Sequence, residues 1–221
     1  MDWQALALSF KLASVTLLFL LPLGLWLGRW LSRTEFAGKA WVEALVVLPL
    51  VLPPTVLGYY LLVSFGGASP IGRWAAEALG VRLTFNFTGI LLASIIFNVP
   101  FMVQPIQRAF EAIPRNLVEA AAVSGLSPWQ TFYRVELPLA WPGLVSAMVL
   151  TFVHTLGEFG VVLMIGGSIP GETKTVAISI YDHVQAFDLA SADRMALLLL
   201  VLSLGAVAAS FFASSRMMVR R

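Results

Sequence analysis

Two ionisable side chains interrupt a long apolar stretch of the chain, and their spacing is the first feature that could carry chemistry. His154 and Glu158 are four residues apart, so on a helix they share one face and could pair. Pairing would lower the cost of placing Glu158 among apolar groups. A lone exposed carboxylate would repel an anionic ligand, so we expect Glu158 to be a structural partner or a gate element.

Other polar side chains fall singly within apolar stretches. A threonine in a membrane span usually bonds its own backbone one turn back, and Asn or Gln can join neighbouring helices. The alternative is that these groups line a path for a polar solute. The candidates for a path or a gate are Thr55, Asn98, Gln104, Thr151, His154, Thr155 and Glu158.

The sequence lacks the common signatures of membrane enzymes. It contains no H-E-x-x-H zinc pattern, no G-x-S-x-G nucleophile elbow and no G-x4-G-K-[ST] phosphate loop. Only two histidines occur, His154 and His183, and the absence of cysteine removes thiol catalysis and Cys-based zinc sites. We therefore expect no catalytic residue, no cofactor and no metal in this chain, and no hydrolysis of ATP by it.

The elements that must carry these residues are membrane spans. The chain has 221 residues, 59% hydrophobic and 12% charged, which is more apolar side chain than one soluble core of this length buries. Its long uncharged stretches suit the roughly 20 residues of a spanning helix. We predict an all-α integral membrane protein, a single domain over residues 1–221. Five transmembrane helices are expected at about 10–29, 43–65, 86–107, 140–165 and 195–215.

Prolines and glycines are expected to interrupt the predicted helices at several positions. Pro49, Pro53, Pro54 and Gly58 predict a kink in the second span, either facing a pathway or serving helix packing. Residues 66–85 read as a loop with a short helical segment at 74–79, and residues 175–187 as an amphipathic stretch.

The distribution of Lys and Arg predicts the orientation, because cytoplasmic loops carry the excess. Nine basic residues fall on one side and five on the other, so we expect the N-terminus outside and the C-terminus in the cytoplasm. They are scattered and form no stripe, which argues against nucleic acid. The cytoplasmic set is Arg29, Arg33, Lys39, Arg108, Arg115, Arg134, Arg216, Arg220 and Arg221; the outer set is Lys11, Arg73, Arg82, Lys174 and Arg194.

The inner segment, about residues 108–139, is unusually polar for this chain and predicts two short helices joined by a turn. Helix propensity is high until Gly125, a natural C-terminal stop. Ser127, Pro128 and Gln130 then form a start signal with a capping box, and Pro138 is expected to end the second helix. Such a rigid elbow suits docking of another protein on its alanine run, although an inert hairpin would satisfy the same pattern.

This segment resembles a known family. Glu119-Ala120-Ala121, then Gly125, then Val135 and Leu137-Pro138 resemble the E-A-A-x3-G-x9-I-x-L-P loop of importer permeases of the ATP-binding-cassette (ABC) superfamily, with Val135 in place of Ile. The resemblance implies the type I importer permease fold and a coupling loop that packs against a separate ATPase. The predicted coupling residues are Arg115, Glu119, Ala120, Ala121, Gly125, Arg134, Leu137 and Pro138.

The same resemblance implies the partners. Two permease chains would work with two ATPase subunits, which hold the ATP and Mg²⁺, and with an oxyanion-binding protein outside the plasma membrane of a bacterium. ATP binding would close the ATPase pair, draw the elbows together and open the permease outward.

A finer resemblance concerns the cargo. Leu52-Pro53-Pro54-Thr55 in the second span, Leu156-Gly157-Glu158-Phe159-Gly160 in the fourth, and Ile169-Pro170-Gly171-Glu172-Thr173-Lys174-Thr175 after it are similar to segments of molybdate permeases. Sulfate and thiosulfate permeases share the G-E-F-G segment. Molybdate import is therefore the expected function, and import of sulfate, thiosulfate or tungstate is the alternative.

Overall fold

The computed structural model describes the backbone of residues 1–219 and the side chains of residues 1–212. Within that part of the chain, the regular elements are all helices. They are α1 (Trp3–Arg33), α2 (Lys39–Val51), α3 (Pro54–Phe65), α4 (Pro70–Leu79), α5 (Phe87–Glu111), α6 (Arg115–Val123), α7 (Pro128–Thr131), the π-helical turn η1 (Phe132–Glu136), α8 (Leu137–Gly157), α9 (Gly160–Gly166), α10 (Val176–Gln185) and α11 (Leu189–Val219).

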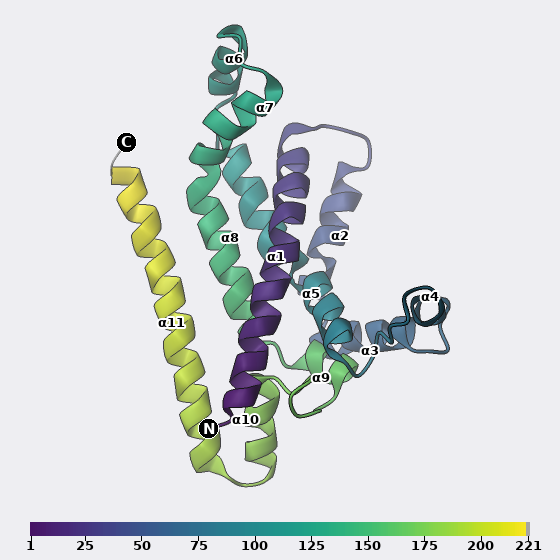
Figure 1. Cartoon of the computed structure of the whole chain (residues 1–221). Coiled ribbons are helices and arrows are strands. Elements are labelled where there is room, and N and C mark those ends of the chain that lie inside the picture. Colours follow the sequence, from purple (N-terminus) through teal and green to yellow (C-terminus); the bar gives the residue numbers. More distant parts are fainter. Residues whose placement is uncertain (220–221) are drawn as a thin grey trace.

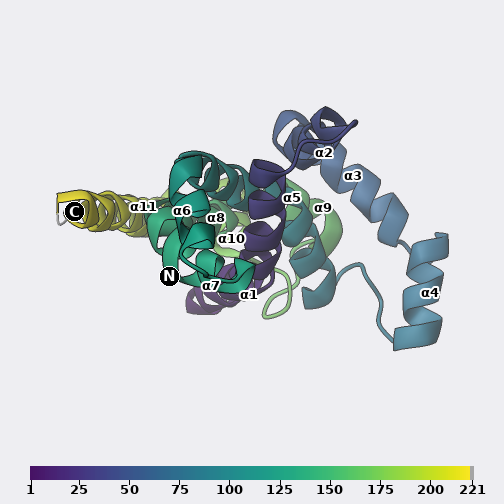
Figure 2. The ribbon, with the colours of Figure 1, turned by 90° about the horizontal axis from the view of Figure 1, so that it is seen from above.

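Three long helices form the centre of the molecule. Helix α1 packs along α5 and α8, and α5 and α8 also pack against each other. Helix α2 covers α5 on one side, while α11 lies against α8 and α10 on the other (Figures 1 and 2). Helices α6 and α7 project from one end of this bundle, which we call the elbow end. The N-terminus and α10 lie at the opposite end, the far end.

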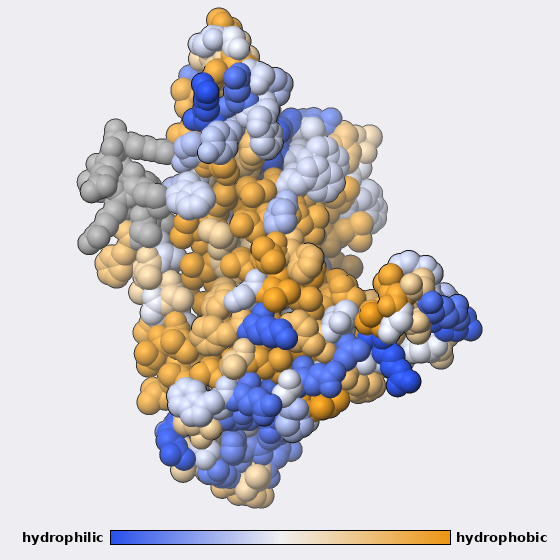
Figure 3. Space-filling view, viewed as in Figure 1, coloured by the Kyte–Doolittle hydropathy of each residue, from blue (hydrophilic) through white to orange (hydrophobic). Residues whose placement is uncertain are grey.

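The surface matches a membrane protein. Figure 3 shows a broad hydrophobic band between two more hydrophilic ends. Because a bilayer core excludes charge, this banding is the arrangement expected of spanning helices. Four helices of the described chain are long and apolar enough to cross a membrane, and the bent pair α2 and α3 makes a fifth if it counts as one span: Trp3–Arg33, Phe87–Glu111, Pro128–Gly157 and Leu189–Phe212, with Lys39–Val51 plus Pro54–Phe65.

The second predicted span is broken rather than kinked. Helix α2 ends at Val51 and α3 begins at Pro54, with an angle of 107° between them. A residue before a proline is driven to the extended region, and here Leu52 precedes Pro53, which itself precedes Pro54. Both residues are extended, with ψ of 137° and 135°. The two consecutive prolines therefore turn α3 away from the bundle.

The fourth predicted span, residues 140–165, is also wrong in its bounds. Helix α8 ends at Gly157, Glu158 is extended with ψ of 127°, and the chain becomes helical again at Gly160. At its other end, the helical stretch begins well before residue 140, since Pro128–Gly157 is one continuous candidate span.

Pro138 does not end a helix, contrary to the sequence prediction. Proline lacks an N–H and clashes with the carbonyl four residues earlier in an α-helix. The preceding turn η1 is instead a π-helix, in which the N–H of Leu137 bonds the carbonyl of Phe132. This wider turn absorbs the proline, so the elbow continues directly into α8.

The connections at the far end contain more helix than predicted. Residues 70–79 form α4, longer than the expected segment 74–79, and α10 occupies most of the amphipathic stretch 175–187. Ser69 caps α4 by accepting a hydrogen bond from the N–H of Gly72, at 2.8 Å. The first and last spans also extend past their predicted ends, as α1 and α11 each have 31 residues.

Hydrogen bonds tie the far end of α1 to α10. The hydroxyl of Ser9 accepts from the N–H of Val176 at 2.8 Å, and the hydroxyl of Ser179 donates to Asp2 at 2.8 Å. Asp2 also caps α1 by accepting from the N–H of Ala5. Partial burial acts to raise the pKa of Asp2, but these hydrogen bonds and nearby positive charges outweigh it and hold the pKa below its ordinary value.

Candidate functional site

The elbow comprises α6, α7 and η1, residues 115–136, and its turn forms as the local signals predict. Gly125 has a φ of +83°, in the left-handed region, and follows Ser124, the C-cap of α6. The N–H of Leu126 bonds the carbonyl of Ala121 at 3.1 Å, which closes the helix end. Ser127 and Gln130 form the predicted capping box at the start of α7. The elbow is therefore a short helix, a fixed turn and a second helix.

The tip of the elbow presents a mixed charged and apolar surface. Arg115, Glu119 and Arg134 are exposed, and none of them makes an ion pair within the described side chains. Val123 and Trp129 are 90% and 73% exposed. Large apolar groups in water beside unpaired charges are typical of a surface that another protein covers.

The predicted coupling residues occupy two levels of the elbow. Ala120 is exposed beside Glu119, whereas Ala121 is buried toward the bundle. Leu137 and Pro138 lie at the start of α8, where the elbow joins the bundle, rather than at the tip. Glu119 and Ala120 therefore face the surroundings, whereas Leu137 and Pro138 belong to the junction with α8.

Sequence reasoning missed an ion cluster at the base of the elbow, in which two partly exposed arginines meet a buried glutamate. Glu136 is 1% exposed and lies between Arg29 and Arg33 of α1. The Nε of Arg29 donates to Glu136 at 2.6 Å, and Arg33 lies 3.2 Å from the other carboxylate oxygen. The only available signal was the four-residue spacing of two arginines at the end of a predicted span, and it does not name their partner.

The two breaks in the spans lie against each other. A Cβ on Gly160, at the start of α9, would be 2.8 Å from the Cβ of Pro54, at the start of α3. Gly58 packs equally closely, since a Cβ there would be 2.8 Å from the Cβ of Met164. Thr55 is exposed in the first turn of α3. Interrupted helices of this kind line solute sites in many transporters.

Glu158 closes one of these breaks and does not pair with His154. Its carboxylate accepts a hydrogen bond from the N–H of Val161 at 2.9 Å. The backbone N–H groups of Phe159 and Gly160 also interact with this carboxylate. These are the N–H groups that the first turn of α9 leaves unbonded. Glu158 is thus the side-chain cap of α9, which corrects the predicted pair.

His154 instead bonds a residue of a neighbouring helix. Its Nδ1 lies 3.0 Å from Oδ1 of Asn98 on α5, and its ring stacks on Phe101 with ring centres 3.8 Å apart. Asn98 also donates to the carbonyl of Ser94 at 2.8 Å. The pair joins α5 and α8 through polar groups inside the apolar bundle.

Of the two threonines of α8, Thr155 follows the structural alternative, whereas the buried hydroxyl of Thr151 has no hydrogen-bond partner within the described part of the chain. The hydroxyl of Thr155 donates to the carbonyl of Thr151 at 2.7 Å, one turn back, and both residues are buried. Neither lines an open path in this conformation.

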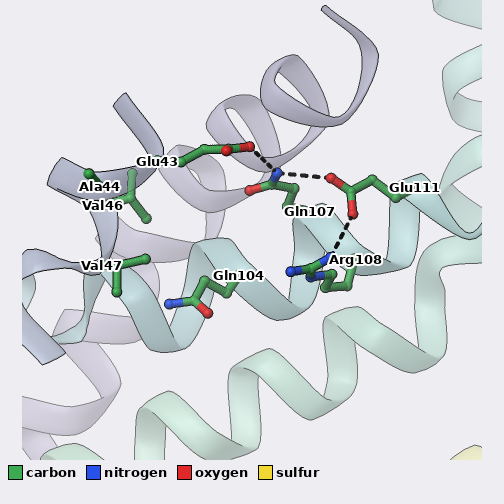
Figure 4. A pocket seen from close by; sticks show the side chains of 8 residues that line it. All are labelled: Glu43, Ala44, Val46, Val47, Gln104, Gln107, Arg108 and Glu111. Atoms are coloured by element: carbon green, nitrogen blue, oxygen red, sulfur yellow. Dashed lines mark hydrogen bonds and ion pairs between the residues drawn. The ribbon is translucent and has the colours of Figure 1, made fainter. Parts of the chain in front are cut away.

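Gln104 lines a cavity of about 420 Å³ between α2 and α5 (Figure 4). Within it, the amide of Gln107 donates to Glu43 at 2.8 Å and to Glu111 at 2.9 Å. The carboxylates of Glu43 and Glu111 and the single cation of Arg108 line this cavity, so the cavity does not favour binding of an anion. Among the described residues, no three histidines or carboxylates gather as metal ligands would. The lining residues are Glu43, Ala44, Val46, Val47, Gln104, Gln107, Arg108 and Glu111.

The contact between Asn98 and His154 is expected to contribute to stability. Asn98→Ala removes the partner of His154 within the bundle, and we expect a loss of about 1–2 kcal/mol of unfolding free energy. Thermal unfolding in detergent measures it. Thr155→Val is the matched control, because Thr155 bonds only its own helix, and it is expected to be nearly neutral. Equal melting temperatures for Asn98→Ala and the unchanged protein would contradict this role.

Comparison with known proteins identifies the family. Residues 21–221 match the model of the binding-protein-dependent transport system inner membrane component. The molybdenum transport system permease protein ModB of Azotobacter vinelandii is 50% identical over 88% of this chain and 86% of that protein. The sulfate transport system permease protein CysT of Escherichia coli is 34% identical over 79% of this chain and 62% of that protein.

Solved structures agree on the fold. A chain of a bacterial ABC transporter involved in the import of the acidic polysaccharide alginate superposes with a TM-score of 0.78 at 20% identity, covering 96% of this chain and 78% of that chain. The predicted all-α permease fold is thereby confirmed, and the relatives are transport permeases rather than enzymes. The chain belongs to the family of binding-protein-dependent transport system inner membrane components.

Proposed function

We propose that this chain is the permease subunit of an ABC importer that moves molybdate inward across a bacterial plasma membrane. The observation that carries the proposal is the 50% identity to a molybdenum permease, spread over 88% of the chain. The exposed elbow supports the coupling part of it, since a separate ATPase would supply the energy and bind the ATP and Mg²⁺.

Sequence identity also favours molybdate over sulfate as the proposed cargo. The sulfate permease of E. coli is a more distant relative, at 34% identity. Molybdate, tungstate and sulfate are all tetrahedral dianions, so similar walls would pass each of them. Transport of sulfate, thiosulfate or tungstate is the alternative that an experiment must separate.

The proposed partners follow from the two ends of the molecule. Two copies of the chain would form the pathway, two ATPases would bind the elbows, and an oxyanion-binding protein would deliver the anion at the far end. In Figure 1 the N-terminus lies at the far end and α11 runs toward the elbow end, which supports an external N-terminus and a cytoplasmic C-terminus. Arg220 and Arg221, two of the basic residues used for that orientation, lie outside the described residues, as does the side chain of Arg216.

The pathway itself is proposed to bind its cargo weakly. The carboxylate of Glu158 lies at the break between α8 and α9, and a negative charge there would disfavour binding of a dianionic cargo at that position. Asn98 and His154 already contact each other through Oδ1 and Nδ1. Selectivity would then reside in the binding protein, and the permease would need to let the anion pass.

Reconstitution tests the proposal directly. The permease, its ATPase and the binding protein in proteoliposomes are expected to accumulate labelled molybdate only when ATP is present. Excess unlabelled molybdate should block uptake more strongly than excess tungstate, thiosulfate or sulfate. No ATP-dependent uptake would reject the transport function, uptake without ATP would indicate a channel or carrier, and a stronger block by sulfate would reverse the cargo assignment.

A further inference from the structure

The ion cluster at the base of the elbow, which we call the joint, consists of Arg29, Arg33 and Glu136. Glu136 lies in η1, at the point where the elbow becomes α8, while both arginines belong to the last two turns of α1. The distances of 2.6 and 3.2 Å place one carboxylate oxygen on each arginine. The contact of Arg29 is a charge-assisted hydrogen bond, whereas Arg33 forms an ion pair without a hydrogen bond. Separating the arginines from Glu136 would leave its buried carboxylate without a cation, which is costly.

Apolar packing between α1 and the elbow is incomplete around the joint. A cavity of about 230 Å³ lies between Arg29 on one side and Val118, Ala122 and Leu126 on the other. The guanidinium of Arg29 also lies over the ring of Phe132, 5.1 Å from its centre. The cavity leaves part of this interface without contacts, so the polar contacts of Arg29 add to the apolar cluster that Leu25, Val118 and Phe132 share between α1 and the elbow.

The opposite end of α1 is also fastened. Its 31 residues extend over about 45 Å at 1.5 Å per residue. At the far end, Asp2 and Ser9 bond Ser179 and Val176 of α10. Helix α1 is therefore held by polar contacts at both of its ends, to the elbow at one and to α10 at the other; Figure 1 shows these elements at the two ends of α1.

We propose that Arg29, Arg33 and Glu136 are positioning residues that make α1 follow the elbow, so that movement imposed by the ATPase reaches the far end of the permease through α1 as well as through α8. The inference rests on the proposed transport function. Without the joint, the elbow would remain attached to α8 and able to bind the ATPase. Its movement would no longer carry α1 and α10 with it.

The test compares transport with ATP consumption in the reconstituted complex. Glu136→Gln keeps the size of the side chain and removes its charge. We expect the variant to assemble with the ATPase and hydrolyse ATP, while the number of molybdate ions imported per ATP falls about ten-fold. Because coupling between two sites is reciprocal, the effect of the loaded binding protein on ATP hydrolysis should weaken as well. A merely structural role would change assembly but leave both of these ratios intact.

Matched variants make the result specific. Glu35→Gln is the control, because Glu35 pairs with Lys39 on the exposed surface of the same end. The exchanged pair Arg29→Glu with Glu136→Arg should recover part of the coupling. If Glu136→Gln does not assemble with the ATPase, Arg33→Gln is tested instead. This variant leaves the contact of Arg29 with Glu136 in place, so it should lower the number of molybdate ions imported per ATP by a smaller factor.

Two outcomes separate this inference from the proposed function. If the unchanged complex fails to import molybdate with ATP, the proposed function is rejected. If the unchanged complex imports molybdate and the joint variants keep the coupling ratio of Glu35→Gln, the joint does not transmit movement and only this inference is overturned.

Discussion

Gly125→Val is expected to reduce ATP-dependent uptake at least ten-fold while the chain stays in the membrane. Gly125 has a φ of +83°, which is unfavourable for a β-branched residue by about 1–2 kcal/mol. Nothing lies within 4 Å of a Cβ placed there, so the cause would be the backbone and not a clash. The turn would change its conformation and displace α6 from α7. Uptake in proteoliposomes and co-purification of the ATPase measure the effect.

The matched control at the same position is Gly125→Asn. Asparagine tolerates the left-handed region better than other residues with a Cβ, so this variant should retain most of the activity. Glu119→Lys tests the exposed rim independently, since it reverses a charge without altering the turn. A normal complex with full ATP-dependent transport in both Gly125→Val and Glu119→Lys would exclude docking at the elbow.

Glu158→Leu is expected to have the second large effect. It leaves the first N–H groups of α9 without their carboxylate, inside the apolar bundle. Losing a side-chain cap costs about 0.5–2 kcal/mol, and we expect the upper part of this range because water is scarce there. The start of α9 should shift against α3, where Gly160 contacts Pro54. Thermal unfolding and uptake are the measurements.

Glu158→Gln separates a structural role from a gating role. The amide oxygen still accepts the hydrogen bond from Val161, but the negative charge is absent. Stability and uptake close to those of the unchanged protein would show that Glu158 acts as a cap. Normal stability with altered uptake would show that the charge itself controls passage of the anion. A Glu158→Leu variant as stable as the unchanged protein would exclude the cap.

The features that the sequence predicted well are those set by local interactions. The turn at Gly125 and the capping box of Ser127 and Gln130 depend on residues within a few positions of each other. The apolar spans follow from the exclusion of charge from a bilayer, which acts on each segment separately. The turn of the elbow and the apolar spans could therefore be predicted without knowledge of the fold.

The features that escaped prediction depend on contacts between distant segments. Asn98 and His154 are 56 residues apart, and Arg29 and Glu136 are 107 apart, so spacing along the chain holds no information about either pair. The prolines at 53 and 54 predicted a kink, but its angle of 107° also reflects the packing of α3 against α9, which is distant in sequence. The end of α8 at Gly157 had glycines on both sides of Glu158 as its only local signal.

The π-helical turn η1 has a consequence for how this permease tolerates changes in length. A π-turn holds one residue more than an α-turn, and each residue of an α-helix advances the chain by about 100°. Deleting one residue between Phe132 and Glu136 would restore α-helical winding and leave the angular relation of the elbow to α8 nearly unchanged, because the extra residue is held within one wider turn. Deleting one residue from the regular part of α8 would instead rotate the elbow by about 100°, so η1 is the place where this helix tolerates a change of one residue.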